Sequence, residues 1–195
     1  MSRFDLRSTL LLAAGVFLRP TPAPAQNALG PGVLREGTLS FDGHATLGDF
    51  NGTTVTVTGE FGASAELGQV TGWVEAVVNT LRTGNGKRDR DLNKSMESDK
   101  YPTMRFELVR VSPEASSGDS IPAMLHGSLL IHGVSHEVDL PTRVLIKGSE
   151  VRIRSDFPLN LTDYQIGGLS KMLGILKMYP DIQVHVDVTF DVSPP

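Results

Sequence analysis

Apolar and polar residues alternate most regularly near the end of the chain, from Ile182 to Val192. Every second residue in this segment is apolar, and the residues between them are polar or charged. A two-residue period places the apolar side chains on one face of an extended strand. The segment therefore predicts a strand with one face buried and the other in solvent.

Seven earlier segments also have the pattern of strands, and glycine-containing or polar turns separate most of them. The third is apolar on both faces and carries the only tryptophan, Trp73, so we expect both of its faces to be covered. Pro141, in the sixth, has no N–H to donate and should lie at an edge or a bulge. The segments are Thr38–Leu47, Thr54–Phe61, Gln69–Leu81, Thr103–Val111, Met124–His132, His136–Lys147 and Val151–Leu159.

Two segments interrupt the strand pattern. Residues 83–96 contain a glycine-rich turn and then a charged, helix-compatible stretch, which predicts a short helix between strands. In Gly167–Met178 the apolar residues Leu169, Met172, Leu173 and Leu176 follow helical spacing. This second segment predicts an amphipathic helix packed over one end of the fold.

About eight antiparallel strands with no alternation of strand and helix predict an all-β fold. A closed antiparallel eight-stranded barrel with one or two short helical insertions is the expected architecture, because closure removes exposed edges. Eight strands also leave room for one ligand. A two-sheet sandwich is the alternative.

The first residues are typical of an export signal. Arg3 and Arg7 precede an apolar run from Leu10 to Leu18, and Ala23-Pro24-Ala25 follows. These features predict a secretory signal peptide over residues 1–25 and one β-barrel domain over residues 26–195, with the mature chain starting at Gln26. The apolar run is shorter than the roughly 20 residues that span a bilayer, which disfavours a retained membrane anchor. A periplasmic or secreted location is therefore expected.

Composition excludes several classes of function. The chain has no cysteine, so disulfides, thiolate metal sites and a cysteine nucleophile are excluded. A net charge of -4 disfavours nucleic acid as a partner. No Gly-x-Ser-x-Gly motif is present, and neither His132 with His136 nor Asp89 with Asp91 completes a metal motif. We expect no catalytic residue, no metal and no cofactor.

Two ordered motifs resemble a known family. Thr83–Leu92 contains T-G-N followed by R-D-x-x-L, and Tyr101–Phe106 has the form Y-P-x-x-x-F. Together with the hairpin sequence Gly127–Val134 and the last alternating strand, they resemble the YceI-like, polyisoprenoid-binding family over residues 37–192. Two features depart from its pattern: Arg90 stands where a small, acidic or polar residue is usual, and Gly167–Met178 is a long insert.

The resemblance implies a lipocalin-like barrel of an exported bacterial protein. It further implies that the barrel holds a polyisoprenoid or similar long-chain amphiphile, such as a quinone-like lipid, without catalysis. We expect Arg88 near the entrance, since Lys87, Arg88 and Arg90 could pair with an anionic headgroup. Apolar residues from several strands would line the interior, with ordinary core filling as the alternative for each: Phe41, Val57, Phe61, Trp73, Phe106, Leu129, Phe157 and Val186.

Other functions stay open at this point. One is a stress-linked interaction protein of the envelope that holds no ligand, and another is an enzyme acting on a lipid in the barrel. The enzyme would need a buried histidine or carboxylate, for which His44 and His126 are the candidates. A homodimer is left open.

Deleting residues 1–25 tests export. The full-length protein, expressed in a bacterium, is expected in the periplasmic fraction or the medium, whereas a chain starting at Gln26 should stay in the cytoplasm. Cell fractionation followed by immunoblotting measures both. Cytoplasmic retention of the full-length protein would contradict the signal peptide.

Overall fold

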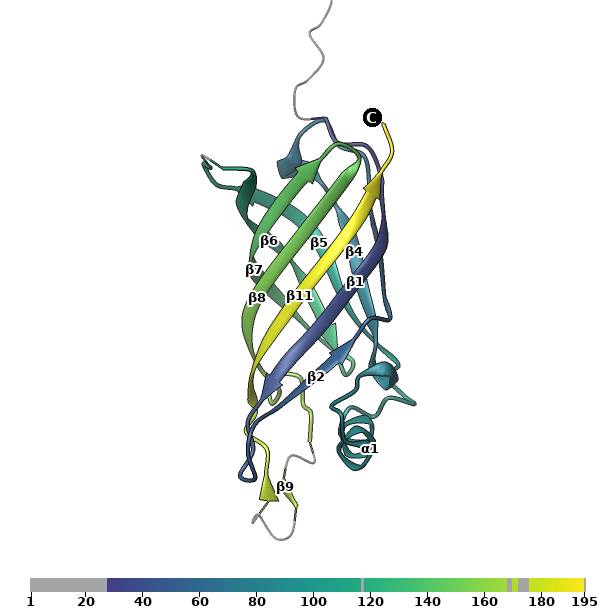
Figure 1. Ribbon diagram of the computed structural model, residues 1–195, viewed down its shortest axis with the longest axis vertical. Helices are drawn as coiled ribbons and strands as arrows, with labels where there is room; N and C mark the ends of the chain where they lie inside the picture. The colour runs from purple at the N-terminus through teal and green to yellow at the C-terminus, as the bar shows by residue number, and fades with distance from the viewer. Residues whose placement is uncertain (1–27, 117, 168–169, 172–175, 195) are drawn as a thin grey trace, which may run out of the picture.

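The computed structural model describes residues 28–116, 118–167, 170–171 and 176–194. The expected signal peptide lies outside these residues. Eight antiparallel strands form a ring in chain order, and the last pairs with the first (Figure 1). They are β1 (Gly32–Gly43), β3 (Val57–Phe61), β4 (Gly72–Val77), β5 (Thr103–Pro113), β6 (Ser120–Ile131), β7 (Val134–Lys147), β8 (Glu150–Asn160) and β11 (Asp181–Val192).

This ring confirms the predicted all-β class and the closed antiparallel eight-stranded barrel, and it excludes the sandwich. Each strand turns alternate residues inward, as the strict alternation of β11 predicts. Two 3-10 turns, Leu67–Gln69 and Val78–Thr80, flank β4. Pro141 lies where β7 stops pairing with β8, and this confirms its expected place at an open edge.

A further strand, β2 (Phe50–Thr54), pairs with the second half of β1. The turn between the first two predicted strands ends before Phe50, so residues 50–52, which the sequence pattern leaves outside the strands, belong to β2. Val55 and Thr56 separate β2 from β3, and the Thr56 amide donates to the buried Thr54 hydroxyl at 3.0 Å. Threonine provides this local hydrogen bond, so the chain interrupts its pairing without leaving an orphaned amide.

The pairing of β1 with β11 closes the barrel, from Gly32 opposite Val192 to Asp42 opposite Gln183. Charged side chains follow this pair on the outside. Arg35 donates to Asp191 at 2.9 Å and to Glu150 at 3.0 Å. His185 lies between Asp156 and Asp42, at 2.5 Å and 3.1 Å from their carboxylate oxygens.

The interior of the barrel is filled toward the end where the C-terminus lies. Phe61 and Phe190 pack there with their ring centroids 5.1 Å apart, and both are buried. A Cβ atom at Gly32 would come within 2.3 Å of the Phe61 ring, and one at Gly72 within 2.7 Å of the Phe61 Cβ. Gly32 is therefore needed to make room for the Phe61 ring. Gly72 is needed for the close approach of β3, because its Cβ would lie 2.4 Å from the Glu60 carbonyl oxygen.

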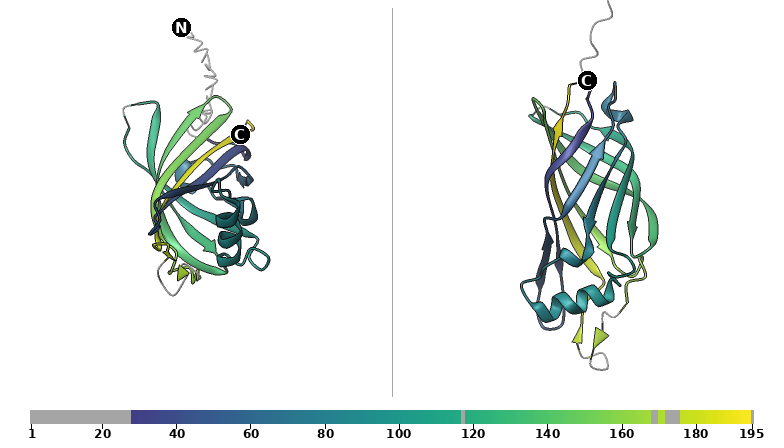
Figure 2. Two further views of the ribbon diagram at one scale, coloured as in Figure 1. Left: turned by 60° about the horizontal axis from the view of Figure 1, so that its bottom comes forward. Right: turned by 90° about the vertical axis from the view of Figure 1, so that its right-hand side faces the viewer.

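At the opposite end helix α1 (Gly86–Ser95) crosses below the strands, as Figure 2 shows. It corresponds to the predicted short helix. The Asn85 side chain caps it by accepting from the Lys87 and Arg88 amides, and Gly84 takes the positive φ of +73° that the preceding turn requires. Among the described residues, no helix has the length and apolar character needed to cross a bilayer.

The prediction of a helix over Gly167–Met178 is wrong for the residues of this segment that the structure describes. Ser170–Lys171 (β9) and Leu176–Lys177 (β10) pair as two short antiparallel strands, while residues 168–169 and 172–175 lie outside the described residues. Four apolar residues were too few to separate a helical period from two short paired strands. Gly174, a poor helix former, also stands within the segment.

The closing strand pair should make stability depend on pH. Hydrogen bonds to Asp156 and Asp42 raise the pKa of His185 above its ordinary 6.5, and the bond from His185 lowers the pKa of Asp42 below 3.8. The stabilisation by both contacts is therefore largest between the two ordinary pKa values, from pH 3.8 to pH 6.5. It is lost as pH rises through the raised pKa of His185, or falls through the lowered pKa of Asp42.

We expect His185→Gln to lower the free energy of unfolding more at pH 6 than at pH 9. Urea unfolding at both pH values measures this, with the pH 9 comparison as the internal control. An equal loss at the two pH values would show that the ion pairs at His185 do not contribute.

Candidate functional site

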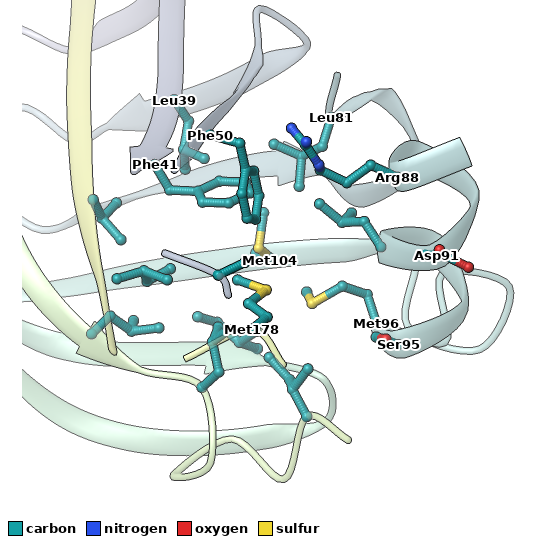
Figure 3. A pocket seen from close by; sticks show the side chains of 18 of the residues that line it. Leu39, Phe41, Phe50, Leu81, Arg88, Asp91, Ser95, Met96, Met104 and Met178 are labelled. Carbon is teal, nitrogen blue, oxygen red and sulfur yellow. The ribbon is translucent and has the colours of Figure 1, made fainter. Parts of the chain in front are cut away.

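A cavity of about 380 Å³ occupies the lower end of the barrel, on the side of α1 (Figure 3). Its wall is formed by apolar residues from β1, β2, β5, β6, β8 and β11 and by Leu81, which follows the second 3-10 turn. They are Leu39, Phe41, Phe50, Leu81, Met104, Leu129, Ile131, Phe157, Leu159, Ile182 and Val184. A wall of this kind favours an apolar occupant and offers it few polar partners.

Helix α1 forms one side of the mouth. Leu92 and Met96, four residues apart, lie on the same face of the helix and both line the cavity. Met96 is buried, so this face holds the helix against the barrel. Arg88, Asp91 and Ser95 follow along the rim, where Figure 3 shows them on the helix.

The connection before α1 fixes the orientation of the helix. The Asp89 carboxylate accepts hydrogen bonds from the Thr83 hydroxyl at 2.6 Å and from the Thr83 amide at 2.8 Å. These bonds lower the pKa of Asp89, so the carboxylate stays charged. Because Asp89 lies one residue from Arg88, the same contacts hold Arg88 at the mouth.

Arg88 lies over the ring of Phe50, with its guanidinium carbon 4.3 Å from the ring centroid. Phe50 in turn meets Phe41 edge to face, at 6.1 Å between centroids. The aromatic ring therefore borders the cavity and also supports a cation at its mouth. Lys87 adds a second cation to the lining, and Asp91 an anion.

Two further segments close the lower end. Ala45 and Met178 form an isolated bridge, and the Tyr179 amide donates to the His44 carbonyl at 2.9 Å. Leu161 and Ile166 line the cavity from the chain that follows β8. The cavity is thus bordered by the first hairpin, by α1 and by the chain between β8 and β11.

Comparison with known proteins identifies this architecture. The model of the YceI-like domain matches residues 35–192, which is most of the chain. The chain belongs to the YceI-like family. No curated protein sequence matches it at a significant level.

Solved structures share the YceI-like fold. A polyisoprenoid binding domain from Saccharophagus degradans, implicated in plant cell wall breakdown, is 14% identical with a TM-score of 0.70, over 85% of this chain and 99% of that one. Burkholderia cenocepacia BcnA is also 14% identical, with a TM-score of 0.66 over 78% and 95% of the two chains. The Campylobacter jejuni YCEI protein is 18% identical, with a TM-score of 0.50 over 64% and 73%.

The structure gives the YceI-like motif a physical basis. Thr83 and Asp89 bond to each other, Gly84 takes the positive φ, and Asn85 caps α1. The ring of Tyr101 packs on His132, at 4.6 Å between centroids. The Pro102 carbonyl accepts from the Val78 amide at 2.8 Å. The motif therefore places the helix at the barrel mouth.

Several residues expected to line the ligand site do lie around the cavity: Phe41, Leu129 and Phe157 in its wall and Arg88 at its mouth. Val57, Phe61, Phe106 and Val186 do not line it and belong to the core or pack against it. These four residues therefore fill the core, which was the alternative considered above.

Trp73 lies on the outside of the barrel. Its indole N–H donates to Glu60 at 3.0 Å, and the Arg105 guanidinium stacks on its ring at 4.1 Å from the centroid. The interior face of β4 carries Val74 and Ala76 instead. Both faces of β4 carry apolar residues, but Glu75 shares the face of Trp73 and was a usable signal that this face points outward.

Sequence reasoning missed the contribution of α1 and of Phe50. The spacing of Leu92 and Met96 was a usable signal, since residues four apart on a short charged helix must face the fold together. Phe50 lies between two of the predicted strands, and its place in β2 depends on pairing with β1. Ile182 and Val184 share the inward face of β11 with Val186, so alternation alone could have included them.

Neither candidate catalytic histidine reaches the cavity. The His126 ring nitrogens lie 2.6 Å from Asp139 and 2.9 Å from the Ser112 hydroxyl, which is a Ser-His-Asp order of contacts. However, none of these three residues lines the cavity at α1. His44 bonds to Asp49 at 2.8 Å in an exposed turn. A lipid in this cavity would touch neither histidine.

Filling the cavity should prevent apolar binding. We expect Met104→Trp to weaken binding of the fluorescent probe N-phenyl-1-naphthylamine at least about tenfold, because the indole would occupy the space that the probe needs. Val109→Trp, an exposed change on the same strand, is the matched control. Fluorescence titration measures both, and equal binding by the two variants would contradict the assignment of the cavity.

Proposed function

We propose that this YceI-like protein binds a polyisoprenoid or similar long-chain apolar amphiphile in the cavity at α1, for carriage or sequestration in the bacterial envelope. The observation that carries the proposal is an apolar cavity inside a closed barrel, with cations at its mouth. The Saccharophagus degradans structure supports the isoprenoid class, because that related domain is described as polyisoprenoid-binding.

Burial of the chain supplies the binding energy. Apolar surface removed from water contributes about 25 cal/mol per Å², so an isoprenoid tail needs few polar contacts to stay bound. Selectivity among tails should then be loose, because Met96, Met104 and Met178 in the lining are flexible and adapt to different shapes. A quinone-like lipid would use the same wall and differ at its headgroup.

The headgroup lies at α1 in this proposal. Arg88 can pair with a phosphate or a carboxylate while its planar group stays on Phe50, and Lys87 adds charge beside it. The protein carries out no reaction on the lipid, consistent with the positions of His44 and His126 away from the cavity. Its place of action is the periplasm or the medium, as the signal sequence suggests.

Binding of farnesyl diphosphate tests this assignment. We expect Arg88→Gln to raise the Kd for farnesyl diphosphate by roughly three- to tenfold, the effect of losing one charge-assisted contact. Arg90→Gln removes the same charge from the same helix away from the cavity lining and should leave Kd within about twofold.

Uncharged farnesol is the second control, and its Kd should be the same in both variants. Isothermal titration calorimetry measures the Kd of each of the two variants for each of the two ligands. Equal effects of Arg88→Gln and Arg90→Gln would contradict a headgroup site at Arg88. If neither farnesyl diphosphate nor farnesol binds the unaltered protein, the proposed function is overturned.

A further inference from the structure

The wall of the barrel is open along its lower part between β7 and β8. The two strands pair from Lys147 opposite Glu150 to Thr142 opposite Ser155, and the pairing stops there. Below that point residues 134–141 pair only with β6, and residues 156–160 pair only with β11. We refer to the space between these two segments as the β7–β8 gap.

Proline borders both sides of this gap. Pro141 ends the paired part of β7, and Pro158 lies in the unpaired part of β8. Proline has no N–H to donate, so each one removes a donor near the place where a continued ladder would run. The sequence itself thus disfavours closure of the wall here.

A second cavity of about 450 Å³ fills the β7–β8 gap. Inward-facing Val138 and Leu140 line it together with outward-facing residues such as Pro141 and Pro158. Leu129, Phe157 and Leu159 line this cavity and also the cavity at α1. The two cavities therefore share three apolar side chains. Residues 134–141 of β7 and 156–160 of β8, which border the gap, do not pair with each other.

A long chain needs more room than the first cavity offers. Its volume of about 380 Å³ is near the lower end of the roughly 300–1,000 Å³ typical of small-molecule sites. The interior farther from α1 is taken by the packed Phe61 and Phe190. The β7–β8 gap adds a second space of similar size, next to the first.

The charges around the two openings differ. Lys87 and Arg88 line the mouth at α1, together with Asp91. Glu137, Asp139 and Asp163 line the β7–β8 gap, where the ring of His136 lies 3.0 Å from the Asp163 carbonyl oxygen. An anionic headgroup is thus favoured at α1 and disfavoured in the gap.

We propose that the β7–β8 gap is a second subsite, which takes the far, uncharged end of the same long-chain amphiphile whose head lies at Arg88. The chain passes between Leu129, Phe157 and Leu159 from one cavity into the other. This inference rests on the proposed function, because it extends the same ligand out of the same cavity. It predicts that affinity rises with chain length beyond what the cavity at α1 can hold.

A chain-length series tests the subsite. The probes are geranyl, farnesyl and geranylgeranyl diphosphate, and Val138→Trp fills the gap without altering the lining of the first cavity. We expect this variant to bind geranylgeranyl diphosphate roughly tenfold more weakly, the effect of losing roughly 60 Å² of apolar burial. Its Kd for geranyl diphosphate should stay within about twofold.

Ile146→Trp, at an exposed position on the paired part of β7 that lines neither cavity, is the matched control and should alter neither Kd. A loss for geranylgeranyl diphosphate but not for geranyl diphosphate supports the subsite. Equal loss for both probes, or no loss for either, overturns it.

A photoreactive ligand tests the path without any substitution. Geranylgeranyl diphosphate with a diazirine at its far end is irradiated in the complex, and peptide mass spectrometry locates the label. Labelling of residues 134–141 or 156–160 supports the subsite. Labelling near Phe61 and Phe190, or on α1, overturns the subsite while leaving lipid binding intact. Failure of every diphosphate to bind overturns the proposed function as well.

Discussion

Contact between Phe61 and Phe190 decides which half of the barrel can hold a ligand. An eight-stranded barrel is only wide enough to be filled by its own side chains or to enclose one small ligand. This chain places its buried aromatic pair at one end and makes room for the Phe61 ring with Gly32. The other end is lined by leucine, isoleucine and methionine around an open space, so cavity, helix and charged rim all gather there.

Helix α1 links the family motif to the site. Its anchoring depends on short polar contacts, namely the Asn85 cap and the bonds between Thr83 and Asp89. Its apolar face supplies Leu92 and Met96 to the cavity, and its polar face carries Arg88 to the mouth. The helix and its C-cap residue Met96 therefore close the barrel, shape the cavity and set the charge at the opening.

Much of this fold follows from residue patterns. The strict alternation in residues 182–192 and the turns between strands were sufficient for the closed barrel, because a two-residue period leaves one choice of inward face. Prediction failed where that choice was ambiguous or depended on a partner. Trp73 lies on a strand that has apolar residues on both faces, and Phe50 forms a strand only through β1.

The site was harder to predict than the fold. Alternation identifies inward-facing residues, but it does not tell which of them touch each other and which border an empty space. Phe61 and Phe157 have the same pattern in the sequence, yet the first is packed against Phe190 and the second borders the cavity. Pro141 and Pro158 disfavour pairing between β7 and β8, but the length of the part that does pair also depends on the registers of the whole ring.

Native mass spectrometry of the purified mature protein, followed by solvent extraction of what it binds, tests the central claim most directly. The account predicts a bound species in a one-to-one complex, with a long apolar chain and an anionic or polar head. It also predicts that Met104→Trp purifies without this species. A ligand-free mass that stays unchanged when prenyl diphosphates are added would contradict the account.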